Sequence, residues 1–338
     1  MRLVCAGKAM AAALLLMIAP LARAQTTRPA APQLTAIRIE PQSIRLDRPG
    51  ATQQILVIGS YSDGTPRDVT GQAQFASSRP EIAAVSKAGR IEPASDGTFT
   101  VTAIVGGKRA SSEVVIQNFK APTKWSFVNQ ITPILTYGGC NQSSCHGSPV
   151  GKNGFKLSLF GYHPDLDYAA LVTQVPGRRV NTKDIDKSLV LLKPTFQIAH
   201  GGGLRFPKDS PEYKTLRAWI EAGAPFGEKE TPVLAKLEVR PGYRVLTGAQ
   251  QKQRLLVTAI YSDGTREDVT PKAVYTSNDD AILKVDRVGV ATPAGGNGDA
   301  AIMVRYGGQV AVAVLGATML PPPRGFPAPP DNLIDREI

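Results

Sequence analysis

Apolar and polar residues alternate along two stretches of this chain, residues 34–118 and 233–316. In both stretches, short runs rich in β-branched residues are separated by turn-forming residues, a pattern that indicates strands joined by tight turns. The first stretch contains Ser62-Asp63-Gly64-Thr65 between two apolar runs. Asp-Gly readily adopts the positive φ angles of a hairpin turn. Each stretch is therefore predicted to fold as a small β-sandwich.

The two stretches are copies of one sequence pattern. Residues 61–70 read YSDGTPRDVT and residues 261–270 read YSDGTREDVT, two hundred residues apart. Asp63 and Asp68 could contact a cation, but turn geometry explains both of them and their repeats. Neither stretch contains a cysteine or a histidine, so we assign no chemistry to them. On this shared string and its flanks, both stretches resemble bacterial Ig-like domains of group 2, which implies spacers or adhesive units.

Residues 123–227, between the two stretches, follow a different pattern. Apolar residues at helical spacing predict a first helix that begins at Ser126, is disturbed by Pro133 and ends just before Cys140. A last helix is predicted to begin after Ser210, a candidate N-cap. Its apolar face consists of Tyr213, Leu216, Trp219 and Ile220. The middle region is therefore predicted to be a mainly α domain.

The middle region also holds the residues most capable of chemistry. All three histidines lie in it, together with Cys140 and Cys145, and His146 follows the second cysteine directly. Two thiols can bond covalently to a haem, and the adjacent imidazole can then bind the iron; the usual spacing is Cys-x-x-Cys-His, whereas here four residues separate the cysteines. A Cys140–Cys145 disulfide is an alternative in an oxidising compartment. A zinc site formed by both thiols, His146 and His200 is a third interpretation.

A six-coordinate haem needs a second axial ligand. Beyond the first 24 residues, methionines occur only at Met303 and Met319, outside the middle region, which leaves His200 and His163 as candidates. We favour His200, because the three glycines that follow it permit close approach of the backbone to a flat ligand. The cations that could pair with haem carboxylates are Arg178, Arg179, Lys193 and Arg205.

Several strings of the middle region resemble the planctomycete-type cytochrome c domain. They are GCNQSSCHG (139–147), GKNGFKLSL (151–159), GRRVN (177–181), SLVLLKPT (188–195), HGGG (200–203) and WIEAGA (219–224). The resemblance implies one covalent haem c held by Cys140 and Cys145, with His146 as the proximal iron ligand and His200 as the candidate distal ligand. It also implies electron transfer to a redox partner protein or to a further C-terminal domain. A proline-rich tail, residues 320–330, leads into residues 331–338, which resemble the beginning of such a domain.

The first 24 residues have the pattern of a secretory signal, with Arg2 and Lys8 followed by an apolar run and the cleavage pattern Ala22-Arg23-Ala24. The protein is therefore expected in the periplasm or on the cell surface, with the cell envelope as a possible contact. The formal net charge is +11, but the basic residues are scattered among acidic ones, which argues against nucleic-acid binding. The sequence lacks common hydrolase and phosphate-loop motifs, so it is not expected to be an enzyme.

Together these patterns predict a multidomain protein with two all-β Ig-like sandwiches on either side of a mainly α cytochrome c-like domain. The leading interpretation of function is an exported c-type cytochrome that binds one covalent haem c and transfers single electrons. The alternative is a cell-surface adhesion or scaffold protein with Ig-like modules and a Cys140–Cys145 disulfide.

Overall fold

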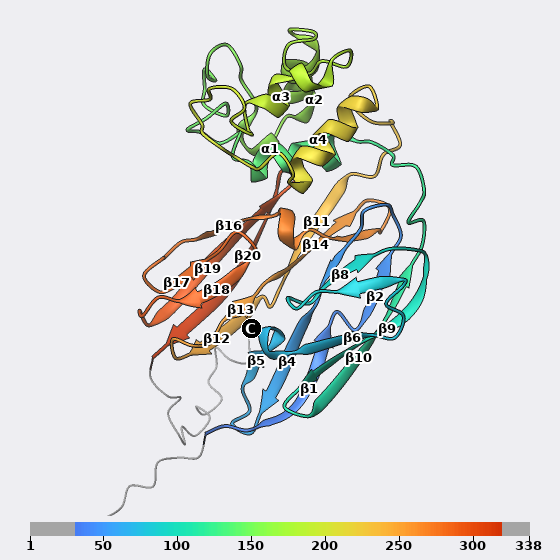
Figure 1. Ribbon diagram of the computed structural model, residues 1–338. Helices are drawn as coiled ribbons and strands as arrows, with labels where there is room; N and C mark the ends of the chain where they lie inside the picture. Colours follow the sequence, from blue (N-terminus) through green and yellow to red (C-terminus); the bar gives the residue numbers. More distant parts are fainter. Residues whose placement is uncertain (1–30, 320–338) are drawn as a thin grey trace, which may run out of the picture. The chain divides into compact units, whose positions relative to one another are not determined.

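The computed structural model describes residues 31–319 (Figure 1). The expected export signal, residues 1–24, and the proline-rich tail, residues 320–338, lie outside the described residues. Within the described chain, the strands fall into two groups, 34–116 and 234–318, and the α-helices lie between them, within 132–221. We refer to the two strand groups as the first and second modules, and to residues 123–227 as the middle region.

The first module consists of ten strands arranged in three small sheets. The sheet orders are β1-β4-β5, β2-β10-β9-β6 and β3-β8-β7. The strand β10 pairs antiparallel with β9 but parallel with β2. The strands are β1 (Leu34–Glu40), β2 (Ser43–Leu46), β3 (Gln53–Gln54), β4 (Leu56–Tyr61), β5 (Pro66–Asp68), β6 (Gln74–Ser77), β7 (Ala83–Val85), β8 (Arg90–Pro93), β9 (Gly97–Val105) and β10 (Lys108–Ile116).

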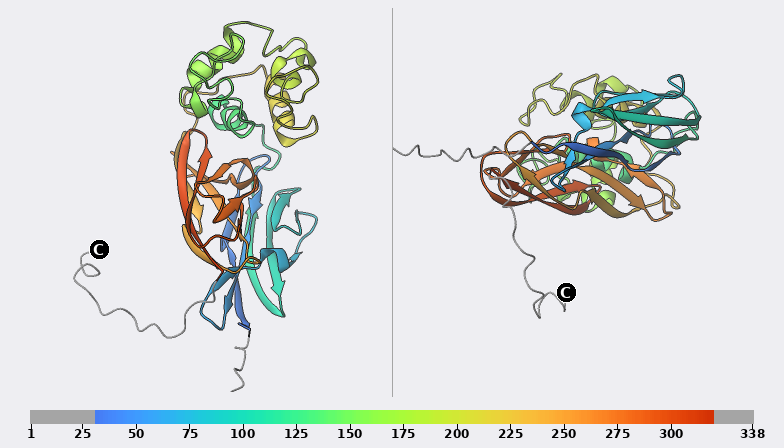
Figure 2. Two further views of the ribbon diagram at one scale, coloured as in Figure 1. Left: turned by 90° about the vertical axis from the view of Figure 1, so that its left-hand side faces the viewer. Right: turned by 90° about the horizontal axis from the view of Figure 1, so that it is seen from below.

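The second module repeats this arrangement strand for strand. Its sheet orders are β11-β14-β15, β12-β20-β19-β16 and β13-β18-β17, and the pairing of Leu34 with Tyr61 recurs as Leu234 with Tyr261. Figure 2 shows the strands of each module in stacked layers. The strands are β11 (Leu234–Arg240), β12 (Tyr243–Thr247), β13 (Gln253–Arg254), β14 (Leu256–Tyr261), β15 (Arg266–Asp268), β16 (Val274–Ser277), β17 (Leu283–Val285), β18 (Val290–Pro293), β19 (Gly298–Tyr306) and β20 (Gln309–Thr318).

The hairpin expected from the repeated string is present in both modules. Gly64 and Gly264 adopt φ angles of 78° and 82°, which side chains with a Cβ disfavour. In the first turn the carboxylate of Asp63 accepts a hydrogen bond from the Thr65 N–H at 3.0 Å, and Asp263 does the same in the second turn. The repeated aspartates therefore fix turns, as the sequence indicated, and we see no need for a cation there.

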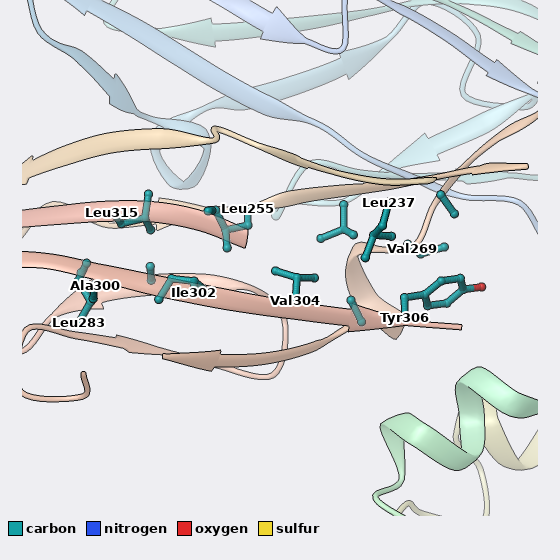
Figure 3. Close-up of a cluster of buried hydrophobic side chains, with 14 of the residues drawn as sticks. Leu237, Leu255, Val269, Leu283, Ala300, Ile302, Val304, Tyr306 and Leu315 are labelled. Atoms are coloured by element: carbon teal, nitrogen blue, oxygen red, sulfur yellow. The ribbon is translucent and has the colours of Figure 1, made fainter. Parts of the chain in front are cut away.

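Alternating side chains from the stacked sheets form the core of each module. In the second module Leu255, Ile302 and Leu315 are fully buried, and Figure 3 shows them converging between the layers. The first module buries Ile55, Val101 and other residues at comparable positions. At about 25 cal/mol per Å² of buried apolar surface, such cores provide most of the driving force for folding.

The outward faces of the two modules differ. On the β12–β20 pair of the second module, large apolar side chains are exposed: Tyr243 (61%), Val245 (43%), Val310 (53%) and Val312 (52%). The equivalent strands of the first module, β2 and β10, expose polar residues: Ser43, Arg45, Arg109 and Ser111. Similar sandwiches therefore present chemically different surfaces.

The expectation of a mainly α middle region is wrong, and the described chain as a whole is mostly β. The region contains one helix of three turns, α4 (Pro211–Glu221), and the short helices α1 (Thr132–Tyr137), α2 (Pro164–Tyr168) and α3 (Leu189–Leu192). Short π-helical and 3-10 turns and long loops account for the rest. Glycines and prolines are the physical reason, because they interrupt helices throughout this sequence.

The two expected helices exist, although the first is shorter and irregular. The residues Phe127–Ile131 form a π-helical turn before α1, because Pro133 has no N–H to donate to the backbone of the preceding turn. The start of α4 is as expected: the Ser210 side chain accepts from the Tyr213 N–H at 3.2 Å. Trp219 of α4 is fully buried beside Phe127, with ring centroids 5.8 Å apart. This contact joins the two ends of the middle region.

Candidate functional site

The middle region contains a cavity of about 790 Å³. The loop after α1 contributes Cys140, Cys145 and His146 to its wall, and the loop between α3 and α4 contributes His200 and Arg205. Further polar lining residues are Lys152, Arg178, Arg179 and Lys193. Apolar side chains complete the wall: Leu135, Phe155, Leu171, Leu189, Val190, Phe206 and Leu216. The structure thus brings together all the candidate site residues named from the sequence except His163.

The cysteine loop turns back on itself directly after α1. Gly139 adopts a φ of 72°, and the Cys140 N–H donates to the Leu135 carbonyl at 2.8 Å. The His146 N–H then donates to the Cys140 carbonyl at 3.0 Å. A Cβ at Gly147 would lie 2.1 Å from the Asn141 carbonyl oxygen, so this loop can close only around a glycine. The loop directs both thiols and His146 to one cavity.

Two imidazole rings lie side by side at the cavity wall. The rings of His146 and His200 are stacked with centroids 6.4 Å apart and 9° between their planes. The His146 Nδ1 lies 3.0 Å from the Phe155 carbonyl oxygen, and the His200 Nδ1 lies 3.2 Å from the Gly203 carbonyl oxygen. Burial lowers the pKa of His146, and the nearby cationic side chain of Arg179 adds to this effect. His146 is therefore neutral at neutral pH.

Two arginines of the site are held by backbone carbonyls. Arg179 donates to the carbonyls of Ala170 (2.9 Å) and Gly154 (3.1 Å), and its guanidinium lies 4.6 Å from the Phe155 ring centroid. Arg205 donates to the carbonyls of Gly138 and Gly202. No aspartate or glutamate lines the cavity, and within residues 31–319 none of its arginines or lysines forms an ion pair. The cavity wall therefore carries uncompensated positive charge.

Cys140 and Cys145 are both free thiols in this structure, and not the disulfide of the alternative interpretation. Burial raises the pKa of the Cys140 thiol to about 11, and this outweighs the opposing effect of Arg205. Cys140 is therefore a neutral thiol at physiological pH and a poor nucleophile.

His163 lies outside the cavity, exposed at the start of α2, where its backbone N–H donates to the Ser158 hydroxyl at 2.9 Å. Sequence reasoning assigned no role to Lys152 or Phe155, both of which line the cavity. The sequence feature that could have indicated these two residues is the glycine-rich string 151–154. It forms a turn that brings both side chains to the cavity wall.

Comparison with known proteins identifies one part of the chain. Residues 33–115 match the family model of the bacterial Ig-like domain, group 2. Ice-binding protein 1 of Shewanella frigidimarina (strain NCIMB 400) is 23% identical over 259 residues, which is 77% of this chain and 26% of that protein. The chain thus spans about a quarter of the length of this relative. Within residues 31–319, no helix is long and apolar enough to cross a membrane.

Solved structures with similar features include domains 5–6 of the S-layer protein SbsC and human protocadherin-24 EC1-2. The S-layer structure is 12% identical, covers 86% of this chain and 99% of its own, and has a TM-score of 0.33. The protocadherin structure is 8% identical, covers 86% of this chain and all of its own, and has a TM-score of 0.18. Agreement at this level carries no conclusion about function.

These findings contradict the cytochrome interpretation. The matched family is Ig-like, and the middle region is not a mainly α domain. Among the described residues, no group of three or more His, Cys, Asp or Glu side chains is placed to hold a metal ion. A covalent haem c and one-electron transfer are therefore wrong as expectations, and so is the zinc site. The side chains around the cavity must be explained in another way.

Proposed function

We propose that this chain is an exported cell-surface scaffold protein in which two Ig-like modules carry the middle region. The observation that carries the proposal is the match of residues 33–115 to a bacterial Ig-like domain. The second module has the same strand order and the same strand registers, which supports a second Ig-like domain at residues 233–316. The signal-like first 24 residues support export. Ice binding is not part of the proposal, because the chain spans only a quarter of that relative.

The exposed apolar face of the second module supports an adhesive role. Tyr243, Val245, Val310 and Val312 lie on one side of the β12–β20 pair and are between 43% and 61% exposed. Contiguous apolar patches of this kind commonly mark contact surfaces. The first module carries polar side chains at the equivalent positions, so its sandwich does not require an apolar face there. We assign the second module to contact with the cell envelope and the first to spacing.

A test of this proposal has two parts. The full-length chain is expressed in a bacterial host, and its exposure is measured by protease treatment of intact cells. Binding of the purified chain to cells is then compared for Val310→Lys/Val312→Lys and for Arg109→Lys/Ser111→Lys, the equivalent positions of the first module. We expect a loss of at least fivefold for the valine pair alone. Retention in the cytoplasm, or equal binding by all variants, would contradict the proposal.

The cavity supports a second, separate function: binding of an organic anion with an apolar body. Five cationic side chains line this one cavity, more than a loop needs for its own stability, and none of them has an acidic partner among the described residues. The apolar lining from Leu135, Phe155, Leu216 and their neighbours suits the body of such a molecule. Charged groups and apolar contacts from the same cavity wall would together set its orientation.

The anionic fluorescent probe 8-anilinonaphthalene-1-sulfonate tests this second function. Arg178→Ala/Arg179→Ala should weaken probe binding at least fivefold. The control Lys108→Ala/Arg109→Ala removes two exposed cations of the first module and should leave binding unchanged. The uncharged analogue N-phenyl-1-naphthylamine should bind both variants equally. Loss of both probes in the cavity variant would indicate a damaged fold instead, and no loss of the anionic probe would refute the assignment.

A further inference from the structure

The two modules exchange a matched pair of hydrogen bonds. The Asp268 carboxylate of the second module accepts from the Gln54 N–H of the first at 2.6 Å. The Asp68 carboxylate of the first module accepts from the Arg254 N–H of the second at 2.8 Å. Asp68 and Asp268 occupy the same position in the two copies, and so do Gln54 and Arg254. The contact therefore has the reciprocity of a two-fold interface within one chain.

Each of these carboxylates also serves its own module. The second oxygen of Asp68 accepts from the Thr70 N–H at 2.9 Å, and that of Asp268 accepts from the Thr270 N–H at 3.0 Å. One oxygen thus fixes the turn after β5 or β15, while the other reaches the facing module. Asp268 is only 6% exposed, so its hydrogen bonds are shielded from water. A carboxylate that only fixed a turn would need one of these oxygens.

A small apolar seam accompanies the exchanged hydrogen bonds. Leu56, Ile58 and Leu256 form a buried cluster separate from the two sandwich cores. Their neighbours Ile55 and Val57 point into the core of the first module. This arrangement explains why residues 55–58 form a continuous apolar run: both faces of the strand are buried, one inside the module and one against its copy.

The interface is not fully symmetric, and the asymmetry selects the partner. Arg48 of the first module pairs with Glu267 of the second at 3.0 Å, and its guanidinium lies 5.2 Å from the Tyr261 ring centroid. The position equivalent to Glu267 in the first module is Arg67. Two first modules facing each other would therefore oppose Arg48 and Arg67, two like charges. The surface fits the second module and disfavours a copy of the first.

We propose that the two modules form one clamped pair, held by the Asp68 and Asp268 exchange, which fixes both ends of the middle region. Residues 33–319 belong to one compact unit. The two modules then do not move independently of each other. The middle region begins after one module and ends before the other. The interface between the modules therefore sets the orientation of the middle region and its cavity. The inference goes beyond the proposed surface role and does not depend on it.

Hydrogen–deuterium exchange of the full chain, read by mass spectrometry of peptides, tests this pairing. Asp68→Ala should raise exchange at least tenfold in the peptide that contains Arg254, in the other module. Asp268→Ala should do the same for the peptide that contains Gln54. The matched controls are Asp63→Ala and Asp263→Ala, which remove hairpin hydrogen bonds made within a single module.

The distinguishing result is where exchange rises. A rise confined to the mutated module would show that each aspartate acts only on its own turn, and the pairing would be wrong. The nearly isosteric Asp68→Leu and Asp268→Leu keep the approximate shape of the side chain, remove both acceptor oxygens, and should give the same cross-module rise if the alanine variants fold poorly. Samples are compared at two protein concentrations. A cross-module effect that appears only at the higher one would assign the contact to separate chains and overturn the proposal.

Discussion

The Trp219 side chain is the best place to test how the middle region is held together. It lies on α4, is fully buried, and donates its Nε1–H to the Pro225 carbonyl at 2.8 Å. Its ring lies beside Phe127 of the opposite end of the region. Trp219→Phe keeps an aromatic ring in place but removes the N–H donor and part of the ring. The Pro225 carbonyl then loses a buried partner.

The expected cost follows from two terms. Leaving a buried carbonyl without its partner costs about 1 kcal/mol. Phenylalanine also lacks two of the buried ring carbons of tryptophan, at about 0.8 kcal/mol for each buried carbon. We expect the variant to lower the free energy of unfolding of the middle region by about 2.5 kcal/mol. The ring contact with Phe127 is retained, so the cost stays below that of Trp219→Ala, about 3–5 kcal/mol.

Intrinsic tryptophan fluorescence can follow the unfolding of the middle region. The chain's two tryptophans, Trp125 and Trp219, both lie in the middle region, so tryptophan fluorescence reports on that region alone. Urea unfolding of Trp219→Phe is followed through Trp125, and the control Trp125→Phe, at a half-buried position, is followed through Trp219. The control should cost less than about 1 kcal/mol. A loss below about 0.5 kcal/mol in Trp219→Phe, or equal losses in both, would refute the reasoning.

Three further predictions concern the same region. Ser210→Ala removes the N-cap of α4 and should cost about 1 kcal/mol in urea unfolding. Because burial raises the pKa of Cys140 from 9.0 to about 11, the folded state keeps a proton that the unfolded state loses. The stability of the middle region should therefore fall between about pH 9 and pH 11, and Cys140→Ala should remove this fall. Gly139→Ala would bring a Cβ within 2.3 Å of Arg205 and should weaken binding of the anionic probe, whereas Gly154→Ala, at a similar φ, meets no neighbour and should not.

The modules were predictable because their signals are local. Alternating apolar residues fix which side of a strand is buried, and the Asp-Gly turn fixes the hairpin. The pairing between modules was not, because the apolar run 55–58 read only as a strand. Nothing in the sequence says that a second module covers one side of it. The carboxylates of Asp68 and Asp268 read as turn residues, and one of their oxygens does fix a turn.

For the middle region, the sequence indicated where the candidate residues lie better than it indicated their chemistry. The candidate residues Cys140, Cys145, His146 and His200 do share a cavity, so their spacing was informative about place. It was misleading about chemistry and about helix content. The apolar run at helical spacing around α1 was read as one longer helix, but Pro133 and the glycines that follow interrupt it. Arg178, Arg179 and Arg205 do line the cavity, although the haem that they were expected to pair with was wrong.

The parallel pairing of β2 with β10, and of β12 with β20, has a mechanical consequence. In each module, a strand near the entry of the chain runs in the same direction as the strand at its exit. Tension along the polypeptide would therefore slide these neighbours past each other, and all the hydrogen bonds between them would have to break together. When the chain is stretched between a cell and a bound partner, its mechanical resistance to unfolding would be greatest at those two strand pairs.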